Sequence, residues 1–470
     1  MNGMPIILWT DAMIYLLLAV IAVATLWIRK RPYLLLPWQR VMKSSVGMVS
    51  LLLLFLFVLV GLLDTVHYRA ALPEKSNGQT VYSPEVLSLL DVLAKDIKSR
   101  NEKTYSAPLA AHLYAKESVE MPNGGVGRDY PRLKYGGAHL ANPQQELFND
   151  VLSRALSGAM AGVLIATLLA ASWTALLYAL RRLSVDRASS MSSPPVTGRQ
   201  PFLALLITTV LLGMLFGMVS NLATAYHVLG TDKVGQDVLY LALKSIRTGL
   251  VIGTVTTLVM LPFALFFGIA AGYLRGWVDD VIQYIYTVLS SIPSVLLIAA
   301  TVLIMQVYIE AHPEWFSTSA ERADLRLLFL CLILGVTSWT GLCRLLRGET
   351  LKLRELEYIQ AAQAFGVSSA RILTRHIMPN VMHIVLIAMV MDFSGLVLAE
   401  AVLSYVGVGV DPTTMSFGTL INSARMEMGR EPMVWWTLAA AFGFMLVLVL
   451  TANLFADAIR DAFDPRLNRT

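Results

Sequence analysis

The chain has 470 residues, of which 56% are hydrophobic and only 15% are charged. A soluble domain usually carries about 25% charged residues, so this composition excludes an ordinary water-soluble enzyme. The apolar residues also come in long blocks, and about 20 such residues are enough to cross the hydrocarbon core of a bilayer. The sequence therefore predicts an all-α protein that crosses a membrane many times.

Nine blocks are long and apolar enough to be membrane spans. The first block is not typical of a cleaved signal peptide, because its basic residues follow the apolar run instead of preceding it. The predicted spans are 7–28, 44–64, 157–180, 202–222, 248–273, 281–305, 326–343, 381–403 and 433–455.

The distribution of Lys and Arg predicts the orientation, because basic residues collect on the cytoplasmic side of a membrane. With the N-terminus outside, the inner segments hold 19 of the 37 basic residues and the short outer segments hold 7. We therefore expect an N-out, C-in topology. The net charge of +5 then reflects topology and does not indicate nucleic-acid binding.

The segment 65–156 is too polar to lie in lipid, and we expect it to form a small extracytoplasmic domain. Ser83, Pro84 and Glu85 predict a helix start, since they combine an N-cap residue, proline at the first helical position and an acid. Leucines follow at helical spacing. Further along, the stretch 183–200 contains Ser and Pro pairs that favour a flexible cytoplasmic linker.

The most informative stretch is the predicted inner loop 344–380. Residues 351–365 are good helix formers, and Gly366 suits the left-handed residue at a helix end. Ser368 or Ser369 then caps a second helix, which Pro379 is expected to end. The loop therefore predicts a helix, a glycine turn and a second helix.

The surface of this loop suits docking into a groove on another protein. Alanines keep the first helix slim, while Tyr358 and Phe365 project as large apolar side chains. A DNA-binding helix-turn-helix is the weaker interpretation. About 37 residues between two spans are too few for its three-helix core beside a membrane.

The loop resembles the Glu-Ala-Ala-x-x-x-Gly signature of integral-membrane subunits of binding-protein-dependent ABC importers. In that family the loop docks on the ATP-hydrolysing subunit. Gln360 stands here where the family usually has glutamate, and Met378 stands where it usually has leucine. The resemblance assigns ATPase coupling to Glu357, Tyr358, Gln360, Ala361, Ala362, Phe365, Gly366, Arg371 and Pro379.

Three further segments resemble the dipeptide and oligopeptide permease branch of that family. Leu229–Val238 is similar to its outer Gly-Thr-Asp segment, Leu403–Gly409 to its outer glycine turn, and Asn453–Leu467 to its C-terminal end. The amphipathic stretch 226–248 is expected to lie flat at the outer surface, either as a gate or as an ordinary interfacial helix. The gate residues would be Gly230, Thr231, Asp232, Gly235 and Asp237.

The resemblance covers 38–64 and 226–467 and implies a type I ABC importer fold with insertions. Either 44–64 or 202–222 could take the place of the family's first helix. The expected parts are an extra N-terminal transmembrane helix (1–37), a family-like first span (38–64), an inserted extracytoplasmic domain (65–156), two extra spans with a cytoplasmic linker (157–225) and the permease core (226–470).

Two carboxylates fall inside predicted spans. A charge near the middle of a bilayer is costly and usually faces a cavity or a partner. Asp392 is therefore expected to line the translocation pathway or to contact a second permease, unless it is hydrogen-bonded inside the bundle. Glu400 lies near an outer end, where a solvated or loop-binding role competes with a place in the pathway. Pro293 is expected to kink the span 281–305.

The resemblance implies a permease subunit of an ATP-driven di- or oligopeptide importer in a bacterial cytoplasmic membrane. We expect no catalytic residue, metal or cofactor on this chain, and ATP and Mg on partner subunits, since the sequence has no Gly-x-x-x-x-Gly-Lys-Ser/Thr loop. The expected partners are a second homologous permease subunit, one or two ATPase subunits, a periplasmic or lipid-anchored substrate-binding protein and membrane lipids, but no nucleic acid.

Two alternatives from other functional classes stay open. One is an ABC permease that acts as an exporter or on another solute, such as nickel. The other is a membrane sensor or regulator, in which 65–156 would be the sensing domain.

Overall fold

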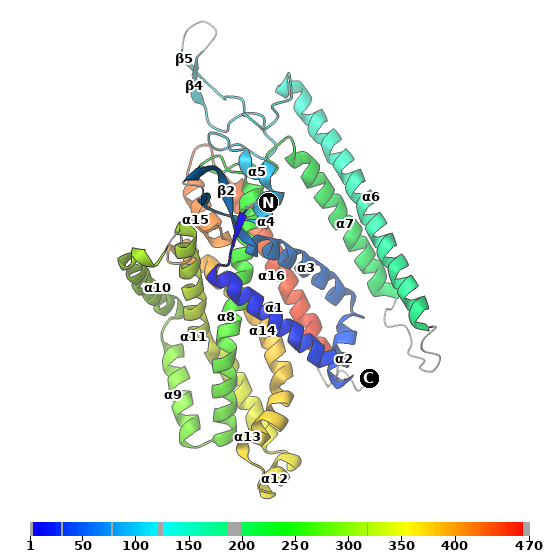
Figure 1. Ribbon diagram of the computed structural model, residues 1–470, viewed down its shortest axis with the longest axis vertical. Helices are drawn as coiled ribbons and strands as arrows, with labels where there is room; N and C mark the ends of the chain where they lie inside the picture. The colour runs from blue at the N-terminus through cyan, green and yellow to red at the C-terminus, as the bar shows by residue number, and fades with distance from the viewer. Residues whose placement is uncertain are drawn as a thin grey trace.

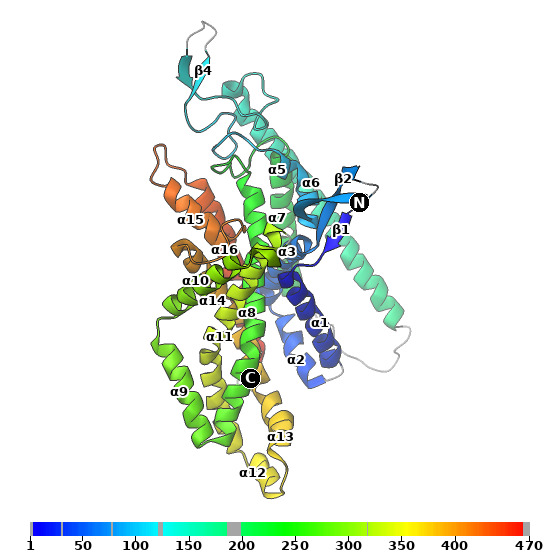
Figure 2. The same cartoon turned by 60° about the vertical axis from the view of Figure 1, so that its left-hand side comes forward.

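The computed structural model describes residues 3–29, 32–76, 79–120, 126–185, 199–316 and 318–463 (Figures 1 and 2). The helices are α1 Trp9–Arg29, α2 Pro32–Val41, α3 Ser45–Thr65, α4 Leu89–Leu93, α5 Lys95–Ser99, α6 Pro143–Val185, α7 Arg199–Ala223, α8 Val238–Leu274, α9 Trp277–Ser291, α10 Ser294–Ala311, α11 Ser319–Arg354, α12 Glu357–Ala364, α13 Ser369–Ile372, α14 Met378–Val406, α15 Phe417–Glu427 and α16 Trp436–Phe463. The strands are β1 Gly3–Ile6, β2 His67–Ser76, β3 Gln79–Ser88, β4 Glu117–Glu120 and β5 Val126–Asp129.

Nine helices in the described part of the chain are long and apolar enough to cross a membrane. They lie in α1, α3, α6, α7, α8, α10, α11, α14 and α16, and each overlaps one predicted span. The helical class of the membrane part is thereby confirmed. Most of the predicted linker 183–200 and the end of the C-terminal motif, 464–467, lie outside the described residues.

The predicted single span 281–305 is wrong, because two helices occupy it. α9 ends at Ser291, Ile292 is extended, and α10 begins after Pro293. Proline lacks an amide proton and pushes the residue before it away from helical geometry. Pro293 therefore separates two helices where a kink in one helix was expected.

Direct backbone contact between α8 and α11 forms the centre of the bundle. A methyl group at Gly268 would lie 2.9 Å from the carbonyl oxygen of Cys343, and one at Gly272 would lie 2.8 Å from that of Arg347. The two helices can approach this closely only because these positions carry no side chain.

Two small antiparallel sheets occupy the end of the molecule opposite α12 (Figures 1 and 2). One has the order β1-β2-β3, and the other pairs β4 with β5. Strand β1 comes from the N-terminus and pairs with β2, which begins directly after α3. The N-terminus and the inserted segment therefore share one end of the molecule, as the expected topology requires.

The helix start predicted at Ser83–Glu85 is wrong, because these residues belong to β3. Pro84 is tolerated there since β3 is an edge strand and the β2–β3 register shifts opposite it. The helix starts later, at α4. Ser88 and Asp91 form a capping box around its first turn.

The stretch 226–248 is not a separate helix lying flat. Its second half is the beginning of α8, which runs without interruption to Leu274. Asp237 caps that helix by accepting a hydrogen bond from the amide of Leu239 at 2.8 Å. The apolar residues that suggested an amphipathic surface helix are largely buried in the bundle, among them Leu239, Leu241 and Ile246.

The helices α6 and α7 form a hairpin beside the rest of the bundle (Figure 1). Gly162 and Gly213 bring their backbones together, since a methyl group at Gly162 would lie 2.0 Å from the carbonyl oxygen of Gly213. The hairpin contacts the bundle through α3. The close contact explains why two long, mostly apolar helices stay paired.

The glycine contact between α8 and α11 can be tested with a matched pair of substitutions. We expect Gly272→Ala to destabilise the protein by about 1–3 kcal/mol, because the new methyl group overlaps α11. Gly341→Ala is the control, since a methyl group there meets no atom within 4 Å. Thermal unfolding in detergent measures both. Equal stability of the two variants would contradict this account of the packing.

Candidate functional site

The predicted inner loop forms a helical hairpin at one tip of the molecule, drawn at the bottom of Figure 1. α12 ends at Ala364 with Phe365 as its C-cap, and Gly366 follows with a φ of +75°, the left-handed geometry that its position predicted. Ser368 takes the N-cap position of α13. The sequence of helix, glycine turn and helix is thereby confirmed.

Two details of the loop differ from the prediction. The helix expected over 351–365 is broken, since α11 ends at Arg354 and α12 begins at Glu357. Pro379 does not end the second helix but lies in the first turn of α14. A π-helical turn over Leu373–Ile377 precedes it. Such a turn changes the backbone hydrogen-bond pattern directly before Pro379, which has no amide proton to donate to the preceding turn.

Three buried isoleucines, Ile359, Ile372 and Ile377, fix the hairpin to the core formed by the inner halves of α8, α11 and α14. Polar contacts with the end of α8 add to this packing. Arg354 donates to the carbonyl oxygen of Tyr273 at 2.9 Å, and the amide of Gln363 donates to the hydroxyl of Tyr273 at 3.3 Å. The hairpin is therefore joined to α8 as well as to its own flanking helices.

An ion pair ties α9 to α11 near the same tip. Arg347 donates from Nε and Nη2 to the two carboxylate oxygens of Asp279, at 2.6 and 2.8 Å. This two-point geometry fixes orientation as well as distance. Arg275 and Glu355 form a second pair on the surface. No sequence motif pointed to either pair, because their members are 68 and 80 residues apart.

The outward face of the hairpin presents the residues assigned to coupling. Phe365 is 87% exposed and Tyr358 is 46% exposed, which is unusual for large apolar side chains outside lipid. Ala362 is half-buried. The remaining assigned residues are exposed: Glu357, Gln360, Ala361, Gly366, Arg371 and Pro379.

The outer Gly-Thr-Asp residues lie inside a junction, and most of them are not on a free surface. Thr231 is completely buried, and its hydroxyl donates to the carbonyl oxygen of Thr104 at 2.9 Å. Its own carbonyl oxygen accepts from the indole of Trp436 at 2.9 Å. Gly230 and Gly235 have positive φ angles that shape the turn. The segment thus joins the stretch around Thr104 to the start of α8.

Asp232 and Asp237 have local structural partners. Asp232 accepts hydrogen bonds from the amides of Val234 and Gln236, which closes the turn. Asp237 caps α8 and also lies 2.8 Å from Nδ1 of His227. Thr231 and Asp237 are therefore too buried to act as an open gate in this conformation.

A buried carboxylate–histidine–carboxylate group holds this junction together. Nε2 of His227 lies 3.4 Å from Glu102, which also accepts backbone amides from Lys134, Tyr135 and Gly136. Burial alone would lower the pKa of His227, but its bonds to Asp237 and Glu102 raise that pKa to about 9. Burial alone would raise the pKa of Glu102, but the bonds that it accepts lower that pKa to about 2.

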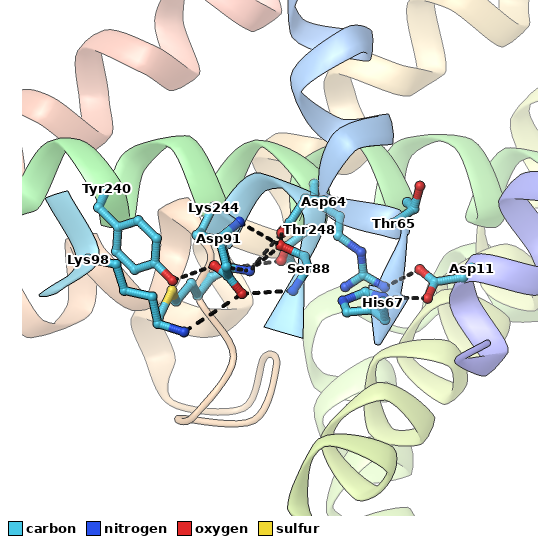
Figure 3. Close-up of polar contacts among 12 residues, drawn as sticks. Asp11, Asp64, Thr65, His67, Ser88, Asp91, Lys98, Tyr240, Lys244 and Thr248 are labelled. Carbon is cyan, nitrogen blue, oxygen red and sulfur yellow. Dashed lines mark hydrogen bonds and ion pairs between the residues drawn. The ribbon is translucent and has the colours of Figure 1, made fainter. Parts of the chain in front are cut away.

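A cluster of charged side chains surrounds the start of α8 (Figure 3). The Lys244 ammonium lies 2.6 Å from Asp64 of α3 and 3.1 Å from Asp91 of α4. Ser88 donates to Asp64 at 2.5 Å, and Tyr240 donates to Asp91 at 2.7 Å. Lys244 therefore joins the inserted segment to α3 and α8.

A second group of charged side chains surrounds Arg247, one turn further along α8. Arg247 donates from Nη2 to Asp11 at 2.5 Å and to Thr10 at 2.9 Å, both at the start of α1. Thr10 in turn donates its amide to Asp324 of α11 at 2.9 Å. Asp11 also lies 2.7 Å from Nδ1 of His67. The extra N-terminal helix is thus bound to the core through buried charges.

The two intramembrane carboxylates have different surroundings. Glu400 is 1% exposed and accepts hydrogen bonds from Ser404 at 2.6 Å and from Ser416, the N-cap of α15, at 2.8 Å. It therefore binds the loop before α15 inside the chain, which is the loop-binding role that was one of its two expected alternatives. Asp392 is half-buried, and none of the described side chains pairs with it.

Comparisons with known proteins place the C-terminal half of the chain in a family. Residues 264–469 match the family of binding-protein-dependent transport system inner membrane components. The oligopeptide transport system permease protein OppC of Mycobacterium tuberculosis (strain ATCC 25618 / H37Rv) is 32% identical over 239 residues, which are 51% of this chain and 76% of that protein.

The dipeptide transport system permease protein DppC of Lactococcus lactis subsp. cremoris is 30% identical over 240 residues, 51% of this chain and 64% of that protein. A solved structure of the MetNI methionine ABC transporter in an inward-facing conformation contains a chain with some structural likeness to this one. The alignment covers 48% of this chain and 98% of that chain, with 16% sequence identity and a TM-score of 0.37. That structural likeness is too low to carry a conclusion.

The buried His227 predicts a pH-dependent stability of the outer junction. A histidine whose pKa rises on folding stabilises the folded state fully below its usual pKa of 6.5, and this contribution is lost as pH rises through about 9. We therefore expect His227→Gln to lower stability by up to about 3 kcal/mol at pH 6 and by much less at pH 9.5.

Thermal unfolding of both proteins in detergent across this range measures the difference. His112→Gln, at a half-buried histidine of the segment 65–156, is the control for general effects of the substitution. A difference between wild type and His227→Gln that stayed constant from pH 6 to 9.5 would contradict the ionic account.

Proposed function

This chain belongs to the family of inner-membrane components of binding-protein-dependent transport systems, and we propose that it is a permease subunit of an ATP-driven importer of short peptides. It is a multi-pass protein of the bacterial inner membrane. In the proposed importer it would pair with a second homologous permease, while separate subunits bind and hydrolyse ATP.

The exposed helical hairpin at 357–372 is the observation that carries this proposal. It presents Tyr358 and Phe365 outward, as a knob that fits a groove on a partner protein. Its inner side is packed against the core through buried isoleucines. A partner that moves this hairpin would therefore move the membrane helices with it.

The helix α8 is suited to carry such a movement across the membrane. Its inner end accepts a hydrogen bond from Gln363 of the hairpin through the hydroxyl of Tyr273, and its outer end carries Lys244 and Arg247. It forms one continuous helix of 37 residues, with Pro262 inside it. Close glycine contacts with α11 favour movement of the two helices as one unit. We propose that closure of the ATPase subunits changes access to the pathway through this pair.

The same proposal gives a role to Asp392, a docking side for the substrate-binding protein and a class of substrate. Asp392 would face the pathway or the second permease, which fits a half-buried carboxylate without a partner among the described side chains. A substrate-binding protein would deliver peptides to the end that carries the inserted domain, with the N-terminus outside and the C-terminus inside. The peptide class is supported by relatives that are named as oligopeptide and dipeptide permeases.

Gly366 provides a sharp test of ATPase docking. We expect Gly366→Ala to weaken retention of the ATPase subunits several-fold, because alanine at a φ of +75° costs about 1 kcal/mol and tilts α12. Gly348→Ala is the matched control, since both sites have open space but only Gly366 has a positive φ. Co-purification of the complex and ATP-dependent peptide uptake by proteoliposomes measure the effect.

The outcomes separate the candidate functions. Deletion of 358–366 with ATPase association and uptake unchanged would overturn the coupling role. Uptake of nickel but not of peptides by the intact complex would replace the proposed substrate. A chain that co-purifies with no ATPase subunit would favour a sensor or regulator instead.

A further inference from the structure

A groove of about 820 Å³ lies between α3 and the hairpin of α6 and α7 (Figure 1). The two helices of the hairpin form most of its wall, and α3 contributes Leu52, Phe55 and Leu56. All three helices are long and apolar enough to cross a membrane. The groove therefore faces the bilayer, and its volume falls within the range of ligand pockets, about 300–1,000 Å³.

The chemistry of this hairpin groove suits a hydrocarbon chain. Its larger side chains are aliphatic or aromatic, such as Ile165, Leu169 and Leu212, and no charged residue is among the described residues of its wall. Phe55 and Phe216 are 59% and 76% exposed, so large apolar surfaces on the wall have no cover within the described chain. Water gains few hydrogen bonds from such a wall, and apolar cavities stay dry.

The glycines that hold the hairpin together also keep this groove open. Gly158 and Gly162 of α6 and Gly213 and Gly217 of α7 all line it. A methyl group at Gly158 would lie 2.5 Å from the carbonyl oxygen of Gly217, so no side chain fits at this contact. The wall therefore cannot carry side chains there that would fill the groove, and the filling has to come from outside the chain.

One end of the hairpin groove is polar, which gives it the polarity of a lipid. The polar residues at the end formed by the first part of α6 and the last part of α7 are Ser157, Ser220, Asn221 and Thr224. From Ser157 to Leu169 the wall extends about 18 Å along α6, at 1.5 Å per residue. That depth is close to half of a hydrocarbon core of about 30 Å, which matches the tail of one leaflet and is too short for a partner helix that crosses the membrane.

A positive charge lies at the same polar end. Arg100 donates from Nη1 to the carbonyl oxygens of Ala223 at 2.9 Å and of Thr224 at 2.6 Å, and Thr224 lines the groove. Both of these hydrogen bonds use Nη1, whereas a guanidinium carries five N–H donors. Guanidinium groups bind phosphate well, so this end suits the phosphate of a lipid headgroup.

We propose that the hairpin groove binds a phospholipid, with one acyl chain along the glycine-lined wall and the phosphate beside Arg100. In the expected topology the polar end is the outer one, so the lipid belongs to the outer leaflet. It would fill the space between α3 and the hairpin and so hold α6 and α7 against the bundle. The proposal needs only that the chain spans a membrane, and it does not depend on the transport of peptides.

Photo-crosslinking of the purified assembly in lipid nanodiscs tests the proposal. The probe is a phosphatidylethanolamine with a diazirine in one acyl chain, and mass spectrometry locates its adducts. We expect Ile165 and Phe216 of the wall to be labelled at least about fivefold more than Leu164 and Leu215, which are similarly exposed on the same helices outside the wall. Equal labelling of the two pairs would indicate contact with bulk lipid only and would overturn the site. Labelling of Leu164 and Leu215 without labelling of the wall would also overturn it, because another protein segment would then fill the groove.

Two alanine substitutions on α6 test the location. Ala161 is exposed and lines the wall, so Ala161→Trp places an indole ring in the groove and should lower labelling of the wall to that of Leu164. Ala171→Trp is the matched control, since Ala171 is also exposed but lies outside the wall, and should be labelled like wild type. Unchanged labelling of the wall in Ala161→Trp would overturn the proposal.

Thermal unfolding of the delipidated proteins gives a second measurement, which separates a filled groove from a damaged fold. Added phosphatidylethanolamine should raise the Tm of wild type and of Ala171→Trp, but not that of Ala161→Trp, whose indole already occupies the space. A damaged fold would lower the Tm of Ala161→Trp both with and without lipid. An equal rise of Tm in the two variants would contradict the proposal.

The place of the phosphate is tested with a diacylglycerol that carries the same diazirine but no phosphate. We expect it to label the wall several-fold less than the phospholipid does. Arg100→Gln should lower labelling by the phospholipid to the level of the diacylglycerol and leave labelling by the diacylglycerol unchanged. Equal labelling by the two probes in wild type would overturn the role of Arg100. Peptide uptake enters none of these measurements, so the lipid site and the proposed importer can fail separately.

Discussion

The contact between α8 and α11 is the constraint on which the rest of the structure depends. Glycines at the crossing let the two backbones touch, which fixes their spacing and leaves little freedom to slide. The hairpin is attached to the end of this pair through the hydrogen bond from Gln363 to Tyr273 and through its buried isoleucines. At the other end, Arg247 of α8 and Asp324 of α11 share the partner Thr10. Both ends of the molecule are thus connected through one packed pair.

Buried charges determine how the additional segments join that pair. The two cations of α8 take their carboxylates from four different elements: α1, α3, α4 and α11. Buried ion pairs often add little net stability, because desolvation offsets the attraction. Removal of one partner nevertheless leaves an uncompensated charge, so the pairing is specific. α1, the end of α3 and α4 are consequently bound to the pair of α8 and α11 through buried charges.

Local signals in the sequence were sufficient where structure depends on neighbouring residues. Each of the nine apolar blocks overlaps a helix long enough to span a membrane, and only the block 281–305 is divided between two helices. Gly366 has the left-handed backbone that its place after α12 predicted. The helix start predicted at Ser83–Glu85 was wrong because the structure there depends on residues far away in the chain. A local helix-start pattern was overridden by pairing of β3 with β2, and β2 in turn pairs with residues 3–6. Such strand pairing between distant segments leaves no local pattern.

The sequence by itself determined that the chain spans a membrane, roughly where its long apolar helices lie and which loop resembles a coupling loop. Apolar length, helix propensity and glycine turns all act within about 20 residues. Only the tertiary structure decided that Thr231, Asp237 and Glu400 are buried. It alone also brought Arg247 to Asp11, 236 residues away. Burial and ion pairing depend on which segments meet in space, and no spacing along the chain encodes that.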